Sequence, residues 1–92
     1  MNDSEFLRAR ASEAAALLKA MSNPNRLLIL CMLCDAPGTS AGELAKASGL
    51  SPSATSQHLA RMREEGLIDS QRDAQRIHYS IRNEAVQQIV AT

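Results

Sequence analysis

The apolar residues near the start of the chain recur at helical spacing. They follow one another at intervals of four, three, four and three positions: Leu7, Ala11, Ala14, Leu18 and Met21. This spacing predicts an amphipathic helix with a narrow apolar seam, along which alanine lets another helix approach closely. The seam can pack inside one subunit or against a second one, and the pattern leaves both open.

Asn23-Pro24 predicts the start of a second helix, because asparagine caps helix N-termini and proline suits the first helical position. Residues 27–34 are apolar on every side, so we expect this helix to be central and buried. Residues 35–38 end it. Ser40 and Glu43 then match a capping box that opens a short helix running to about Ala47.

The next helix has both ends marked in the sequence. Ser51 can cap its N-terminus, Pro52 suits the first helical position, and Gly66 can take the left-handed conformation that closes a C-terminus. Two short helices joined by a turn containing glycine are typical of the helix-turn-helix motif.

The second of these helices carries short polar side chains near its N-terminus. Thr55, Leu59 and Met62 share the one face able to bury itself, whereas Ser53 and Gln57 point the other way. A helix that enters the DNA major groove carries such residues, because bulk would keep it from the base edges. An ordinary polar surface is the alternative. The predicted DNA contacts on this helix are Ser51, Ser53, Thr55, Ser56, Gln57 and Arg61.

After Gly66 the apolar period changes to two, and residues 67–72 and 76–81 predict the strands of a β-hairpin. No glycine lies near the hairpin tip, so we expect a loop longer than a tight two-residue turn. A hairpin directly after a recognition helix makes a winged helix. Three residues near the tip are predicted DNA contacts, the two arginines to phosphates: Arg72, Gln75 and Arg76.

Asn83 begins a last helix whose apolar residues are Ala85, Val86, Ile89 and Val90. So short a helix is marginal alone, and it either packs on a partner or continues in a longer chain. The expected fold is mainly α with a β-hairpin: a winged helix-turn-helix in the order α-α-α-α-β-β-α, dimeric, with residues 1–92 forming a single DNA-binding domain.

Composition adds limits to this picture. A 92-residue monomer would be marginally stable, and with only Phe6 and Tyr79 aromatic its core must be aliphatic. The longest apolar run is too short to span a bilayer and no signal segment opens the chain, so we expect a cytoplasmic protein without a membrane partner. The net charge of zero counts mildly against DNA binding, but residues 61–82 hold five arginines.

Four parts of the chain together resemble the ArsR/SmtB family of bacterial winged-helix repressors. They are AsnProAsnArgLeuLeuIleLeu (23–30), GlyGluLeuAla (42–45), the run from Leu50 to Ile68 and the Tyr79 strand. The resemblance covers roughly residues 14–90. It implies a repressor that binds double-stranded, palindromic operator DNA. We expect a homodimer built from the N- and C-terminal helices, because the Leu7–Met21 seam and the apolar face of residues 85–90 both offer surface to a partner.

The founding members of that family sense metals, so we compared the positions of their metal ligands with the residues of this sequence. The thiolate pair of one family site falls here on Ser40 and Gly42, and the Asp-x-His pair of the other falls on Asn83 and Ala85. These residues do not supply the thiolate, imidazole or carboxylate ligands that such sites need. We therefore expect no metal site and no cofactor.

Cys31 and Cys34 stand three positions apart on one helix and have three interpretations. They can be small buried hydrophobes. They can form a redox pair, although such pairs usually lie at a helix N-terminus and these lie near a C-terminal end. The resemblance adds a third. In the sulfide-responsive branch a cysteine at the place of Cys31 reacts with persulfides and links to a second cysteine in the last helix, where this sequence has none. We expect Cys31 to lie deeper than Cys34 and to be the reactive residue.

Functions from different classes remain open. The first is a homodimeric DNA-binding regulator, a repressor, that senses reactive sulfur through Cys31. The alternatives are a winged-helix protein-interaction module without DNA binding, and a constitutive regulator with structural cysteines. An enzyme is not expected, because the sequence offers no nucleophile–base set, carboxylate pair or phosphate loop.

Overall fold

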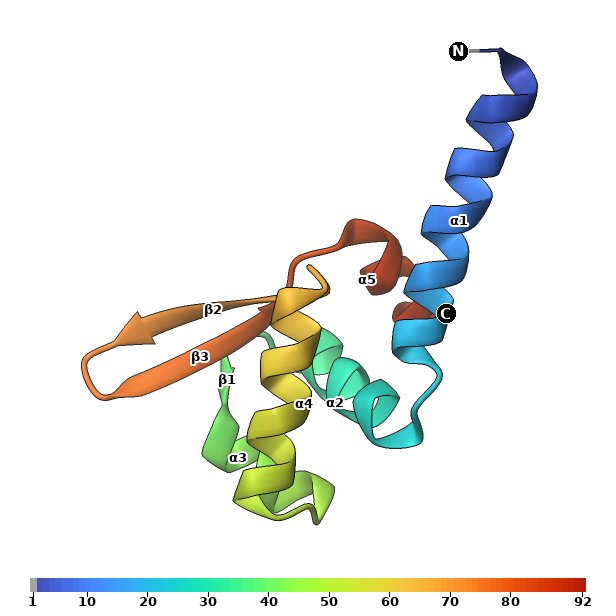
Figure 1. The fold of residues 1–92 in the computed structure, drawn as a ribbon. Coiled ribbons are helices and arrows are strands. Elements are labelled where there is room, and N and C mark those ends of the chain that lie inside the picture. The colour runs from blue at the N-terminus through green and yellow to red at the C-terminus, as the bar shows by residue number, and fades with distance from the viewer. Residues whose placement is uncertain (1) are drawn as a thin grey trace.

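The computed structural model describes residues 2–92 and shows the expected winged helix-turn-helix arrangement (Figure 1). In chain order the elements are α1 (Asp3–Met21), α2 (Pro24–Asp35), β1 (Thr39–Ser40), α3 (Ala41–Ser48), α4 (Pro52–Glu64), β2 (Ile68–Asp73), β3 (Arg76–Ile81) and α5 (Glu84–Ala91). The predicted order of helices and hairpin is confirmed, and β1 is an addition that the sequence did not predict.

Side-chain caps set the helix starts at the predicted residues. The Asn23 side chain accepts from two backbone N–H groups of the first turn of α2, and Asn83 does the same for α5. Ser40 and Glu43 form the reciprocal capping box of α3, and the Ser51 hydroxyl caps α4. Each cap satisfies N–H donors that the first helical turn leaves free.

The core lies where α2, α3, α4, the sheet and α5 meet. Its fully buried members are aliphatic or methionine: Ile29, Leu30, Leu33, Leu44, Leu59, Met62, Leu67, Ile68 and Val86. The core therefore holds the helix-turn-helix unit, the base of the hairpin and α5 together.

The sheet has three antiparallel strands in the order β1-β3-β2. Thr39 pairs with Tyr79 and Ser40 with His78, so β1 adds a short third strand to the base of the hairpin. The Gly38 N–H also donates to the Tyr79 carbonyl at 2.8 Å. The wing is thereby tied to the segment that enters α3.

The prediction of a long loop at the hairpin tip was wrong. Asp73 pairs with Arg76, which leaves a two-residue turn, Ala74-Gln75. Ala74 takes a φ of 57°, a left-handed conformation that glycine usually occupies. The pairing of the two strands imposes this turn without the residue that favours it.

The prediction that α2 is buried on every side was also wrong. Ile29, Leu30 and Leu33 are buried, but Leu27 and Leu28 are about 40% exposed and Cys31 is exposed. Among residues 2–92 this side of the helix remains largely uncovered, so α2 contributes an exposed apolar surface.

Candidate nucleic-acid interface

The helix-turn-helix is formed by α3 and α4, which meet across a turn at Gly49. Gly49 ends α3 with a φ of 76°, so the chain can reverse direction there. The Ser48 hydroxyl accepts from the Leu50 N–H at 3.3 Å and steadies the same turn. This local geometry fixes how α4 leaves the core.

One face of α4 is buried and the opposite face is open. Leu59 and Met62 lie in the core, whereas the side chains of Ser53, Ser56 and Gln57 are exposed. The helix therefore presents the short polar residues singled out in the sequence to solvent at its N-terminal half. Such a surface can approach base edges closely.

Thr55 does not fit its predicted role as a DNA contact. Its side chain is 1% exposed, and its hydroxyl donates to the Ser51 carbonyl at 3.0 Å. Thr55 thus faces the core and satisfies its own polar group within the helix. Ser51 is exposed, and its hydroxyl oxygen accepts from the Ala54 N–H at 3.1 Å.

Arg61 lies on the last turns of α4, with its side chain 65% exposed. Its Nε donates to the Glu65 carboxylate at 3.3 Å, an i,i+4 pair. The other nitrogens of the guanidinium keep donors for a further acceptor. Arg61 therefore remains a candidate for an anionic partner, at a distance from the N-terminal face of α4.

The wing carries its cations at the tip. Arg72, Gln75 and Arg76 are all exposed and surround the two-residue turn. Two links at the base position this hairpin against the rest of the molecule. Arg63 of α4 donates to the Ser70 hydroxyl at 3.2 Å, and Arg82 lies 3.9 Å from Asp69. Neither link is visible in the sequence, because the first depends on how α4 packs against β2 and the second on the register of β2 and β3.

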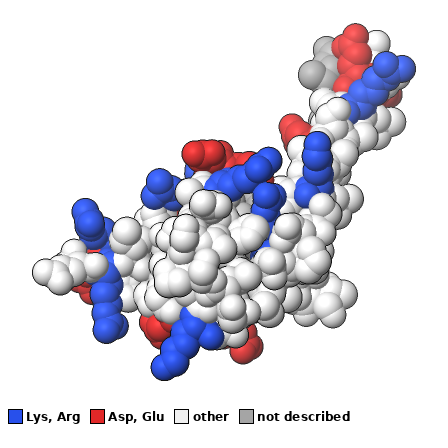
Figure 2. Space-filling view, turned by 60° about the horizontal axis from the view of Figure 1, so that its bottom comes forward, with Lys and Arg blue, Asp and Glu red and all other residues white. Residues whose placement is uncertain are grey.

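The charged side chains lie around the margin of one face of the molecule, and the middle of that face has none (Figure 2). Figure 2 shows a face whose centre carries no charged side chain, while basic and acidic groups lie along its margins and basic groups project from the hairpin at the left. A neutral centre with cations on the wing suits hydrogen bonding to bases in the middle and phosphate contacts beside it.

Glu43 lies at the start of α3, beside the Ser40 cap. The hydrogen bonds from the Ser40 hydroxyl and the Ser40 N–H lower the pKa of Glu43 below its ordinary value. Arg76 and His78 add smaller favourable charges. The carboxylate is thus kept ionised as the capping partner of α3, which is a structural rather than a chemical task.

The two cysteines lie beside α5, but not as predicted. Cys31 is exposed and Cys34 is half-buried, so the expectation that Cys31 is the deeper thiol was wrong. Cys34 Sγ accepts from the Gln87 side chain at 3.2 Å. Both cysteines line a cavity of about 540 Å³ that Val90 and Ala91 close from α5.

The histidines stand apart from each other. His78 Nδ1 lies 2.8 Å from the Gly38 carbonyl oxygen, and His58 is half-buried on α4. Within residues 2–92 no three His, Cys, Asp or Glu side chains gather as a metal site would require. Over the same residues, no helix combines the length and the apolar character needed to cross a membrane.

A second surface of the molecule is apolar. The first turns of α1 project beyond the core, as Figure 1 shows, and residues 3–16 of the helix are exposed throughout. Large hydrophobic side chains lie open on three helices, each at least 40% exposed: Phe6, Leu7, Leu18, Leu27, Leu28 and Ile89. Large hydrophobic side chains left open on several helices make these helices candidates for an interaction surface.

Comparison with known proteins gives consistent matches. Residues 23–70 match the model of the bacterial regulatory protein family arsR. The chain is 73% identical over 92 residues to the HTH-type transcriptional regulator YgaV of Escherichia coli, covering all of this chain and 93% of that protein.

Solved structures agree with that match. A crystal structure of a predicted DNA-binding transcriptional regulator from E. coli superposes with a TM-score of 0.90 at 75% identity, covering 95% of this chain and 92% of that one. A homodimeric winged helix-turn-helix DNA-binding domain from Mycobacterium bovis superposes with a TM-score of 0.80 at 27% identity, covering 99% of this chain and 82% of that one.

Proposed function

This chain belongs to the ArsR family of bacterial regulatory proteins, and from that premise we propose that it is a transcriptional repressor that binds operator DNA as a homodimer. The observation that supports this most is the two-sided character of α4. Its apolar side is anchored in the core and its short polar side is open to solvent. This is the arrangement that a recognition helix needs in the major groove.

The proposal assigns separate tasks to the exposed residues. Ser53, Ser56 and Gln57 read base edges, since hydroxyl and amide groups can hydrogen-bond there. Ser51 and Arg61 contact the backbone at either end of the helix. Wing residues Arg72, Gln75 and Arg76 contact phosphates or sugars beside the groove. Thr55 has no place in this set because it is buried.

The homodimer supplies the second recognition helix that a palindromic operator requires. The projecting α1 and the open sides of α2 and α5 carry the apolar side chains described above. A second copy of the chain would remove them from water. The M. bovis domain of the same fold is described as homodimeric.

Selection from a random double-stranded DNA library tests the proposal without knowledge of the operator. We expect the protein to enrich sequences with two inverted half-sites whose centres lie about one helical turn apart. Affinity for the enriched sequence should fall steeply with salt. If no DNA sequence is enriched and the protein shows no salt-dependent affinity for DNA, a winged-helix module that contacts proteins is favoured.

Sulfur sensing by Cys31 stays a second candidate, supported by its exposure and by the cavity it shares with Cys34. A persulfide RSSH could oxidise the two thiols to one disulfide, with release of RSH and H₂S. The test compares operator affinity before and after a persulfide donor for the wild type, Cys31→Ser and Cys34→Ser. Equal loss in all three would exclude both cysteines, whereas loss in the wild type alone would support the pair.

The relatives are transcriptional regulators, which are not enzymes. We infer that this chain has no catalytic activity either. Regulators of transcription act on the chromosome, so we also propose that it works in the bacterial cytoplasm. Its residues 1–92 would then serve as one DNA-binding domain.

A further inference from the structure

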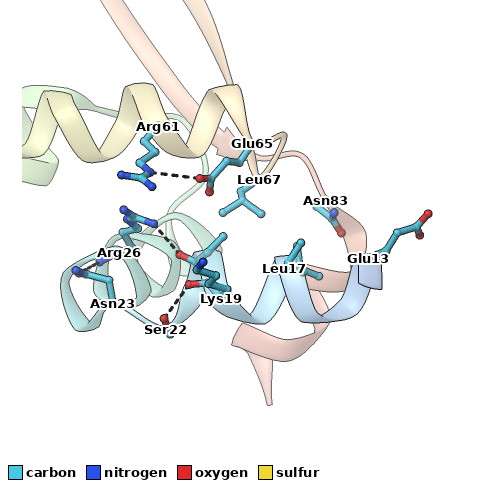
Figure 3. A pocket seen from close by; sticks show the side chains of 12 residues that line it. Glu13, Leu17, Lys19, Ser22, Asn23, Arg26, Arg61, Glu65, Leu67 and Asn83 are labelled. Carbon is cyan, nitrogen blue, oxygen red and sulfur yellow. Dashed lines mark hydrogen bonds and ion pairs between the residues drawn. The ribbon is translucent and has the colours of Figure 1, made fainter. Parts of the chain in front are cut away.

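A cavity of about 810 Å³ opens between the C-terminal half of α1, the start of α2 and the C-terminal end of α4 (Figure 3). Of the residues assigned to DNA above, only Arg61 lines it. The cavity therefore lies behind the base-reading part of α4, at the junction of the projecting helix and the helix-turn-helix unit.

Arg26 of α2 is the unusual residue of this cavity. One edge of its guanidinium is used, because Nη1 donates to the Ala20 carbonyl at the end of α1 at 3.3 Å. Its Nε is buried and has no hydrogen-bond partner among residues 2–92. A buried donor without an acceptor is costly, so the described residues leave the Arg26 guanidinium incompletely satisfied.

A second arginine approaches from the opposite wall. Figure 3 shows Arg61 descending from α4 so that its guanidinium faces that of Arg26, with Glu65 bonded to Arg61 Nε at one side. Lys19 also lines the cavity. Glu13 lines its far end, and Figure 3 shows its carboxylate turned away from the two arginines.

Two guanidinium groups that face one another repel unless an anion lies between them. Arginine presents planar pairs of N–H donors that match the oxygens of phosphate and similar groups. Glu65 pairs with Arg61, and the lining as a whole holds three cations, Lys19, Arg26 and Arg61, against the two carboxylates of Glu13 and Glu65. The concave shape would exclude water from a bound anion and strengthen these bonds.

We propose that this cavity binds a phosphate-type oxyanion between Arg26 and Arg61. The anion accepts from the terminal N–H groups of Arg26 that the Ala20 carbonyl does not engage and from the free donors of Arg61. Such a ligand can be a small free anion or a phosphate of a DNA backbone that reaches the mouth of the cavity. The two sources share one chemistry, and titrations with each distinguish them.

An anion at this position could affect regulation, because the two arginines stand on different helices. Arg26 holds the end of α1 through Ala20, and Arg61 stands on α4. An anion between them would join the dimerisation helix to the recognition helix and favour one relative orientation. This last step rests on the proposed DNA-binding function, whereas binding of the anion does not.

The test uses the full chain labelled with ¹⁵N in phosphate-free buffer and follows the arginine Nε–Hε resonances. Inorganic phosphate, added against chloride at equal ionic strength, should shift the Arg26 and Arg61 signals saturably in the millimolar range. Arg61→Gln should lower the affinity for phosphate at least about tenfold, as expected when a charge-assisted hydrogen bond is lost. Arg8→Gln, the same charge change on the projecting part of α1, should leave the affinity unaltered.

A parallel titration uses the operator selected above. If phosphate shifts the Arg26 resonance and DNA does not, the ligand is a small free anion. If DNA shifts the Arg26 resonance and free phosphate reverses that shift, the ligand is a phosphate of the DNA backbone. Absence of saturable shifts with both, or equal phosphate affinity in Arg61→Gln and the wild type, would overturn the site. Phosphate binding by a protein that ignores DNA would support the cavity and refute the proposed function.

Discussion

Gln57 is exposed on the N-terminal half of α4, where its amide can both donate to and accept from a base edge. Glutamine pairs with adenine through two hydrogen bonds, and a good pair contributes about 1–3 kcal/mol of discrimination. Gln57→Ala should therefore relax the preference at one base pair of the half-site. Binding to single-base operator variants measures this. An equal loss on every sequence, unrelated DNA included, would show that Gln57 does not read bases.

Ala74 occupies the left-handed region at the tip of the wing, with a φ of 57°. This conformation costs an L-residue about 1–2 kcal/mol, and glycine avoids that cost while adding flexibility to the unfolded chain. Ala74→Gly should raise the free energy of unfolding by about 0.5–1 kcal/mol. Urea unfolding measures the change. Gln75→Gly is the matched control and should bring no gain, because Ala74 alone among the non-glycine residues 2–92 has a positive φ.

At the scale of single residues, the caps were predictable and the exposure of the residues on α2 was not. Ser40, Ser51, Asn23 and Asn83 cap the helices as predicted, because a cap depends on the few residues around it. The exposure of Cys31 depends on which side of α2 has neighbours. The composition of one helix does not contain that information.

The wing is an element whose tip cations should act together on phosphates. Arg72 and Arg76 are exposed on either side of the turn. Replacing either by glutamine should reduce the slope of log affinity against log salt by about one, since each contact releases about one counterion. Base preference should persist. Arg8→Gln serves as the control, and an unchanged slope in both wing variants would show that the wing does not touch DNA.

At the scale of elements, periodicity predicted the longer strands but not the shortest strand or the turn. The period of two predicted β2 and β3 to within about one residue, because each strand has enough positions to display alternation. β1 has two residues and exists only through its pairing with β3. The tight turn was missed for a related reason, since strand register, and not a glycine, determines it.

The whole molecule is incomplete as a single chain. Leu18 is 58% exposed on α1, so a charge there costs a monomer little but would be buried unpaired in the proposed dimer. Leu18→Glu should weaken dimerisation at least about a hundredfold, because an unpaired buried charge costs several kcal/mol. Sedimentation velocity across a concentration series measures this.

Ala9→Glu is the control for that variant, since Ala9 is exposed on α1 away from the apolar seam. It should sediment like the wild type. A wild-type protein that stays monomeric at micromolar concentration would contradict the dimer directly. The seam was predictable from periodicity, and the fold class from periodicity together with the capping and turn residues. The share of α2 in the apolar surface was not, because it follows from the three-dimensional packing of α1 and α5 around that helix.

The third strand of the sheet also bears on how the protein is made. His78 and the Gly38 carbonyl meet across a separation of 40 positions, and β1 has no pairing partner other than β3 within residues 2–92. During synthesis, α1 to α4 leave the ribosome before the residues that pair with β1. The wing can therefore be tied to the segment that precedes α3 only after the residues of β3 have been made.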